Sequence, residues 1–258
     1  MFLKSFSRIK RKVSVTLMLL ACPVMRAAVP QWMAGAFEQI DQPWYVAADM
    51  GTSFGQCTFR SITESDTHAG FQIGITGGYH LNRLISFEAG LQFGGQTQTA
   101  LDCCPYWLSS DGERFMSPVI DKKGWYYSDI ESSTGWSKLL AQAHFEVLSL
   151  FMEQEFPWSF SLAPQLSIVT TRSKLITPES HLINNRQWHL GLGGQAIVGY
   201  RINEDMDAAF YTGITCLTGK RFDNIPEHGH KSNFIWDAGL KVIYRVDLGS
   251  YFSSLLKK

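Results

Sequence analysis

The residues best suited to chemistry are charged side chains at alternate positions of otherwise apolar segments. Glu88 and Glu146 are the carboxylates, and Arg201, Lys241 and Arg245 are the cations that could pair with them. A buried charge without a partner is costly in an apolar interior, so we predict structural ion pairs among these five residues. The functional alternative is a small gated pore, in which a carboxylate exchanges one cation for another. A catalytic pair of carboxylates would need a cleft, which the spacing does not indicate.

Four cysteines in the body of the chain are candidates for disulfide bonds. Cys57, Cys103, Cys104 and Cys216 are all expected near one rim of the fold. An oxidising compartment would favour disulfides there, and cross-links between molecules are equally open. A bond between Cys103 and Cys104 would close a strained ring, so each is expected to bond a different partner. The spacing matches no zinc pattern, and we predict no metal and no cofactor.

The N-terminal region predicts export. Five basic residues among positions 4–12 precede the apolar segment VSVTLMLLAC at positions 13–22, and two alanines follow at 27 and 28. A bacterial signal peptide has this layout, and the apolar part is too short to span a bilayer. We predict a cleaved signal peptide over residues 1–27 and a periplasmic segment over 28–43. Cys22 stands in a sequence that resembles a lipoprotein box, so lipidation of Cys22 is the alternative.

Composition narrows the class of protein. The 23 basic and 23 acidic residues give a net charge of zero, which argues against a nucleic-acid partner. Apolar residues make up 45% of the chain, which argues against general disorder. With 13% aromatic residues, 22 glycines and only 18% charged residues, the sequence favours many strands with one apolar and one polar face over a helical protein.

Apolar and polar residues alternate through the body of the chain. Residues 85–94 show this clearly, with Phe87 and Leu91 on one face and Glu88 and Gln92 on the other. Successive side chains of a strand point to opposite faces, so this period of two predicts strands. The eight predicted strands cover residues 44–51, 71–80, 85–94, 137–152, 158–169, 188–201, 206–217 and 234–246.

Two of these strands carry irregular features. Residues 137–152 alternate as a strand does, but they include many helix formers, and an apolar helical stripe also fits them. We predict a strand because strands surround this segment. Pro164 lies within residues 158–169 and cannot donate a hydrogen bond to a neighbouring strand, so we expect a β-bulge there.

The joints between the strands alternate strictly in length. A transmembrane β-barrel has this order, with long extracellular loops and short periplasmic turns. The predicted fold class is therefore all-β: an antiparallel, eight-stranded, up-and-down transmembrane barrel over residues 44–246, followed by a C-terminal tail over 247–258. The long joints are residues 54–70, 97–135, 174–187 and 218–233, and the short ones are 81–84, 153–157 and 202–205.

The apolar face of the barrel is expected to face lipid. The export signal supports this, as do aromatic residues such as Trp44, Trp158 and Tyr244, which lie near strand ends like an interfacial girdle. Small residues on the polar face fit a narrow lumen. A soluble periplasmic barrel with its apolar face inside is the alternative. We expect the bacterial outer membrane as the location, with its lipid and lipopolysaccharide as partners.

Short motifs resemble the OmpA-like family of outer-membrane barrels. GYHLNRLI at 78–85 and FEAGLQFG at 87–94 are similar to strands two and three of that family. WYVAADMG at 44–51 resembles its first strand, and GLKVIYRV at 239–246 resembles its last. The resemblance implies a small eight-stranded barrel, an architecture shared by structural proteins, adhesins and a few enzymes. The chain departs from the family at Val246, where an aromatic residue commonly ends the chain.

One loop motif resembles the active site of an enzyme family. The segment HKSN at 230–233 is similar to the His-x-Ser-Asn motif of the outer-membrane lipid A 3-O-deacylases. That resemblance implies Ser232 as the nucleophile and His230 as its base, with Asp237 as a weak candidate for the orienting acid. An omptin-like surface protease would need ten strands, and residues 115–130 could supply the extra hairpin. We predict that the protein is not an enzyme.

The longest loop, residues 97–135, is rich in aromatic side chains. Trp107, Trp125, Tyr126 and Tyr127 suit contact with an external protein or glycan. Exposed loops usually carry recognition on a rigid scaffold. The predicted function is a structural or surface-recognition role, like that of an adhesin, with the extracellular loops as the contact surface.

Overall fold

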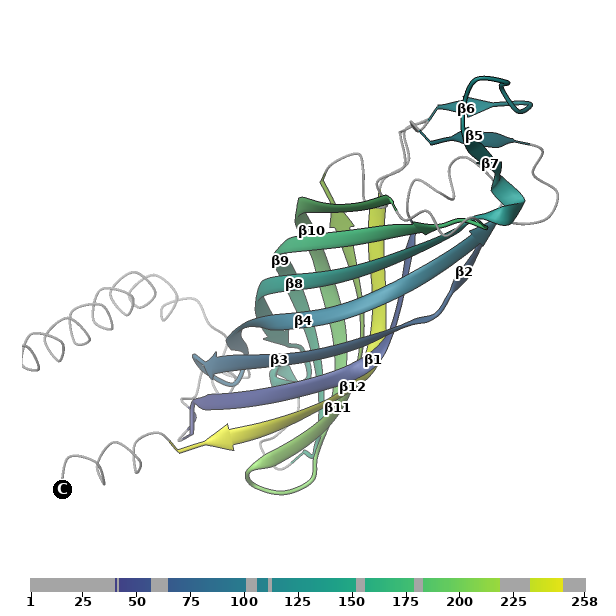
Figure 1. The fold of residues 1–258 in the computed structure, drawn as a ribbon. Helices are drawn as coiled ribbons and strands as arrows, with labels where there is room; N and C mark the ends of the chain where they lie inside the picture. The colour runs from purple at the N-terminus through teal and green to yellow at the C-terminus, as the bar shows by residue number, and fades with distance from the viewer. Residues whose placement is uncertain are drawn as a thin grey trace, which may run out of the picture.

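The structure, a computed structural model, describes residues 40, 42–56, 65–100, 106–110, 113–151, 156–178, 183–218 and 233–247. Eight long strands run up and down in antiparallel pairs, and pairing of the first with the last closes the barrel (Figure 1). The predicted fold class is confirmed. The barrel strands are β1 (Trp44–Gln56), β3 (Gly70–His80), β4 (Ile85–Ala100), β8 (Glu131–Glu146), β9 (Trp158–Ile176), β10 (Ile183–Arg201), β11 (Met206–Leu217) and β12 (Asn233–Val246).

The segment that could have formed a helix is a strand. β8 pairs with β4 on one side and with β9 on the other. It ends earlier than predicted, because the chain then makes the 3-10 turn η3 (Leu148–Leu150). The hydroxyl of Ser149 donates a hydrogen bond to the Glu146 carbonyl at 2.7 Å, which fixes this turn. Among the described residues, no helix is long and apolar enough to cross a bilayer.

The prediction of a β-bulge at Pro164 is wrong. On the β10 side, the register of β9 is unbroken, and Pro164 lies opposite Gly194. On the β8 side, the ladder skips the two positions between Leu162 and Gln165 and then resumes in the same register. Pro164 therefore removes a hydrogen-bond donor towards β8 without inserting an extra residue.

Several strands extend farther on the outer side than predicted. β4 continues to Ala100 and β9 to Ile176, while β8 begins at Glu131 and β10 at Ile183. These extensions are rich in polar residues such as Thr and Ser on both faces, so they lack the apolar alternation that marks the rest of each strand. Thr still favours the extended conformation, and hydrogen bonds to neighbouring strands hold the extensions in place.

The longest loop contains a small sheet of its own. β5 (Trp107–Ser109) pairs with β6 (Arg114–Phe115) and β7 (Gly124–Tyr126), and the 3-10 turn η2 (Tyr127–Asp129) leads from β7 towards β8. A further short strand, β2 (Ser65–His68), pairs with the outer end of β4. Residues 115–130 thus add no hairpin to the barrel, which has eight strands in the described part of the chain rather than ten.

The turn between β3 and β4 lies where the OmpA-like motifs place it. The Oδ1 atom of Asn82 accepts hydrogen bonds from the N–H groups of Leu84 at 2.9 Å and Ile85 at 2.8 Å. Asn favours such turns because its side chain can bond nearby backbone groups. The second and third barrel strands meet at this turn, as the resemblance implied.

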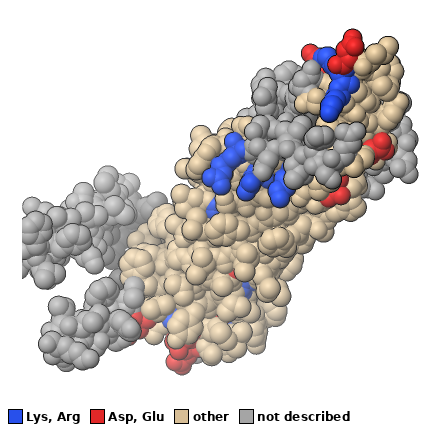
Figure 2. All heavy atoms as spheres, in the orientation of Figure 1, with Lys and Arg blue, Asp and Glu red and all other residues tan. Residues whose placement is uncertain are grey.

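The outer surface of the barrel is apolar and its lumen is polar. Phe71, Ile73 and Ile75 are exposed on β3, whereas Gln72 and Thr76 on the same strand are buried. Figure 2 shows a largely uncharged band between two ends that carry charged side chains. A soluble barrel would have the opposite arrangement. These features place the chain in a bacterial outer membrane, as expected, and exclude the soluble alternative.

Candidate functional site

The periplasmic half of the lumen contains a hydrogen-bonded network around Glu88. Lys241 Nζ lies 2.5 Å from Glu88 Oε1, and Gln142 Nε2 donates to the same oxygen at 2.8 Å. The Tyr45 hydroxyl donates to Oε2 at 3.2 Å, and His144 Nε2 lies 3.4 Å from that oxygen. The partners come from β1, β8 and β12, so the network connects three parts of the barrel wall to β4. Both carboxylate oxygens of Glu88 thus have hydrogen-bond partners, and these bonds across the lumen rigidify the interior.

A second charged pair lies nearer the outer end of the lumen. Lys138 Nζ is 2.9 Å from Asp237 Oδ2, and both side chains are fully buried. Asp49 Oδ1 accepts hydrogen bonds from Gln72 Nε2 at 3.1 Å and from the Tyr211 hydroxyl at 3.3 Å. These side chains cross the lumen and fill it, as is usual in a barrel of this size.

The five predicted ion-pair residues divide between the lumen and its periplasmic end. Glu88 and Lys241 form a pair, which is one of several pairings that the sequence left open among the five. Glu146, Arg201 and Arg245 instead line a cavity at the periplasmic end. Sequence reasoning placed these residues on the correct face but did not find their partners. The pairing of Lys138 with Asp237 was missed, although both residues occupy polar positions of the alternating pattern.

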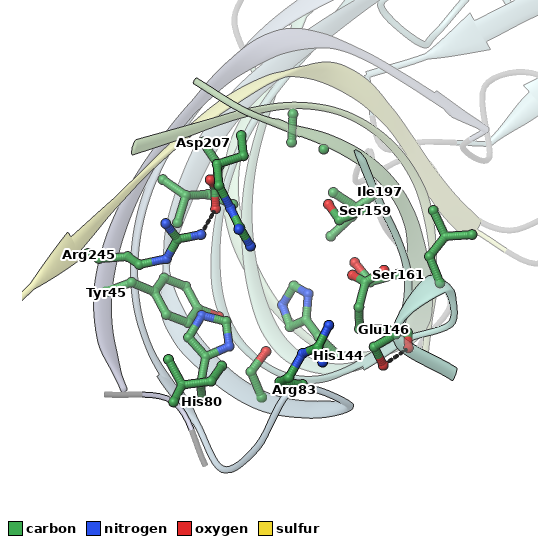
Figure 3. A pocket seen from close by; sticks show the side chains of 18 of the residues that line it. Tyr45, His80, Arg83, His144, Glu146, Ser159, Ser161, Ile197, Asp207 and Arg245 are labelled. Atoms are coloured by element: carbon green, nitrogen blue, oxygen red, sulfur yellow. Dashed lines mark hydrogen bonds and ion pairs between the residues drawn. The ribbon is translucent and has the colours of Figure 1, made fainter. Parts of the chain in front are cut away.

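The cavity at the periplasmic end has a volume of about 720 Å³ (Figure 3). Arg245 pairs with Asp207 at one side of it, and Glu146 accepts a hydrogen bond from the backbone N–H of Phe160 at 2.6 Å at the other. Figure 3 also shows Arg83 pointing into this space. Side chains of the Glu88 network line the inner end of the cavity, so it is a recess rather than a passage.

An apolar cluster lies at the outer end of the barrel. Trp125 and Tyr127 of the longest loop pack with Trp136 and Val169 of the barrel wall. A Cβ atom at Gly94 would lie 2.4 Å from the Trp136 ring, so glycine there makes room for the indole. The loop and the barrel therefore share one small core. Its other members are Leu108, Ile130, Leu217 and Ile235.

Three of the four residues of the predicted aromatic contact surface are buried in the structure. Trp107, Trp125 and Tyr127 are buried, whereas Tyr126 is 43% exposed. The Trp107 ring packs against Phe115, with ring centroids 5.9 Å apart. Aromatic residues in a loop can form either a contact surface or the loop's own core, and their positions in the sequence do not distinguish the two. Here the three buried residues hold the loop together, so an external partner does not reach them.

The remaining chemical candidates receive little structural support. Asp237 pairs with Lys138 inside the lumen. Cys216 is a free cysteine on the outward face of β11. No group of three or more His, Cys, Asp or Glu residues in the described part of the chain could hold a metal ion. The candidates that lie outside the described residues are Cys57, Cys103, Cys104, His230 and Ser232.

Comparisons with known proteins give similar structures but no family. No protein-family model and no curated protein matches the sequence. Neisserial surface protein A is 14% identical, with 79% of this chain and 97% of that chain covered and a TM-score of 0.47. Ail, the attachment invasion locus protein of Yersinia pestis, is 9% identical, with 80% and 100% covered and a TM-score of 0.40. The N-terminal β-barrel domain of Pseudomonas aeruginosa OprF is 14% identical, with 80% and 98% covered and a TM-score of 0.39.

Likenesses of this strength say nothing about function. The assignment of the chain rests instead on its own strand pairing and on the distribution of its side chains. The closed order of eight strands, the apolar outer surface and the polar, side-chain-filled lumen identify the protein as an eight-stranded β-barrel of a bacterial outer membrane, the architecture that the OmpA-like resemblance implied.

Proposed function

We propose that the protein is a surface-recognition barrel, comparable in role to an adhesin, and that the small sheet of β5, β6 and β7 is its contact surface. The observation that carries this proposal is the exposure of two large apolar side chains after β6. Ile120 is 100% exposed and Met116 is 77% exposed. Figure 1 shows this sheet beyond the outer ends of the barrel strands. Exposed apolar residues in such a place suit the centre of a protein contact.

The base of the loop supports this role because it holds the tip in place. Trp125 and Tyr127 anchor the loop to the barrel core. Lys122 pairs with Glu113 and lies over the Phe115 ring, with Nζ 5.2 Å from the ring centroid. A loop that is already ordered loses less conformational entropy when a partner binds. The buried aromatic residues thus favour recognition indirectly, by fixing the exposed ones.

The two alternative functions have less support. A pore would need an open path, whereas the buried apolar cluster at the outer end and the buried pair of Lys138 and Asp237 favour a packed interior. A hydrolase would use His230 and Ser232, and neither lies within the described residues. Recognition of an external partner by the longest loop is therefore the function that we propose.

The test is adherence of a non-adherent bacterial strain that expresses the protein to a monolayer of cultured epithelial cells. Ile120→Asp is expected to reduce adherence about tenfold, because it places an unpaired charge at the centre of an apolar contact. Ser128→Asp adds the same charge at another exposed position of the loop and should adhere like the unmodified protein. Equal adherence of the Ile120→Asp variant, at equal amounts of folded protein in the membrane, would contradict the proposal. So would failure of the unmodified protein to confer adherence.

A further inference from the structure

Three basic residues stand together on the outward face of β9 and β10. Arg172 and Lys174 occupy alternate positions of β9, and both are exposed, while their neighbours Thr171 and Ser173 are buried on the lumen side. Arg186 on β10 is also exposed. The strand alternation therefore directs all three cations away from the barrel axis.

The register places two of these cations directly opposite each other. Arg186 is the cross-strand partner of Arg172. In an antiparallel pair, side chains in this relation have Cβ atoms about 4.5–5.5 Å apart. The two guanidinium groups are therefore close enough to contact the same anion.

The cations lie immediately outside the apolar belt. The next outward-facing row towards the membrane pairs Trp188 with Thr170, and the row after it pairs Leu190 with Ile168. Trp188 and Leu190 are strongly exposed, as expected for an interfacial aromatic residue and a lipid-facing residue. One row along a strand pair is about 7 Å, so the cations stand at the depth of the lipid headgroups. Figure 2 shows basic side chains gathered just beyond the uncharged band.

We propose that Arg172, Lys174 and Arg186 bind a phosphate group of a phosphorylated glycolipid in the outer leaflet. The long loops lie at this end of the barrel, so the headgroups at this depth belong to the leaflet that faces the exterior. Two arginines can bind phosphate through paired N–H donors, and a lysine adds a compact charge. The acyl chains of the same lipid would lie along Trp188 and Leu190. This site is on the barrel wall, and it does not depend on the loop contact proposed above.

The experiment measures binding of purified lipid A to the folded, full-length protein in detergent micelles by native mass spectrometry. The variant Arg172→Gln/Lys174→Gln/Arg186→Gln is expected to bind lipid A at least about tenfold more weakly, because charge-assisted hydrogen bonds are lost. The unmodified protein should bind dephosphorylated lipid A as weakly as the variant binds lipid A. Lys123→Gln/Arg201→Gln removes exposed cations elsewhere and should bind lipid A normally.

Two further arms distinguish the source of the phosphate and the folding of the variant. Inorganic phosphate at millimolar concentration should not displace lipid A, because it lacks the acyl chains that lie on the belt. Displacement by inorganic phosphate would overturn the assignment to a lipid, and equal lipid A binding by the triple variant would overturn the site. The triple variant should keep the heat-modifiable gel migration of a folded barrel, since its substitutions bury no new group. If the triple variant does not fold, the Arg172→Lys/Arg186→Lys variant, which keeps both charges, takes its place. This variant should still bind lipid A more weakly, because lysine lacks the paired N–H donors of arginine. Unchanged affinity for lipid A would contradict the proposal.

Discussion

Replacement of Lys138 by Met is expected to lower the free energy of unfolding by about 3–5 kcal/mol. Lys138 Nζ lies 2.9 Å from Asp237 Oδ2, and neither side chain is reached by solvent. The substitution leaves the Asp237 carboxylate buried without its cation, and the loss of a partner costs more than a charged pair contributes. The measurement is urea-induced unfolding in phospholipid vesicles, followed by tryptophan fluorescence.

A double variant separates the cost of an unpaired charge from a simple loss of packing. Lys138→Met/Asp237→Leu removes both charges, and it should be more stable than Lys138→Met alone, because no charge is then left unpaired. Asp237→Asn alone should be destabilised in the same direction as Lys138→Met. If Lys138→Met unfolds at the same urea concentration as the unmodified protein, the pair is not buried as the structure describes it.

Replacement of Tyr127 by Ala is expected to destabilise the protein by about 3–5 kcal/mol, the range for truncating a large buried aromatic residue. Tyr127 is 0% exposed and lies in the cluster that joins the longest loop to the barrel. The adjacent residue offers a matched control, because Tyr126 is 43% exposed. Tyr126→Ala should therefore have a much smaller effect on the same urea transition.

Limited proteolysis shows where this loss of stability is located. In the Tyr127→Ala variant, a protease added from outside should cut the longest loop much faster than in the Tyr126→Ala variant, while the barrel strands stay protected by the membrane. Equal cleavage of the two variants would mean that Tyr127 does not hold the loop to the barrel. The loop would then lack the fixed base on which the proposed contact surface depends.

The alternation of side chains made the membrane-spanning part predictable. Where a strand has lipid on one side and a narrow lumen on the other, each residue must suit one of two opposite environments. The residue types alone therefore predict that Phe71 faces lipid and that Gln72 faces the lumen. Residues 137–152 also alternate, but their helix-forming residues left a helix open, and the strand was predicted from the strands that surround the segment.

The outer end of the protein was less predictable because that constraint disappears outside the membrane. Beyond the belt both faces of a strand can be polar, so the extensions to Ala100 and Ile176 gave no apolar alternation. Aromatic residues there can pack together or stay exposed. Trp125 and Tyr127 are buried against Trp136, which lies on the barrel wall and not in the loop.

The partners in the lumen were not predictable from alternation either. Alternation gives the face of a residue but not its height relative to residues on distant strands. Glu88 and Lys241 are 153 residues apart, and Lys138 and Asp237 are 99 apart. Which of these side chains meet depends on the stagger between strands that closure of the barrel sets.

Nitroxide scanning along β3 in reconstituted vesicles tests the orientation of the barrel wall most directly. Single labels at positions 71, 72, 73, 75 and 76 report how readily oxygen dissolved in lipid reaches each side chain. The structure predicts high oxygen accessibility at Phe71, Ile73 and Ile75 and low accessibility at Gln72 and Thr76, since the first three are exposed and the other two are buried. High accessibility at positions 72 and 76, or no alternation between the two sets, would contradict a barrel with its apolar side chains in lipid.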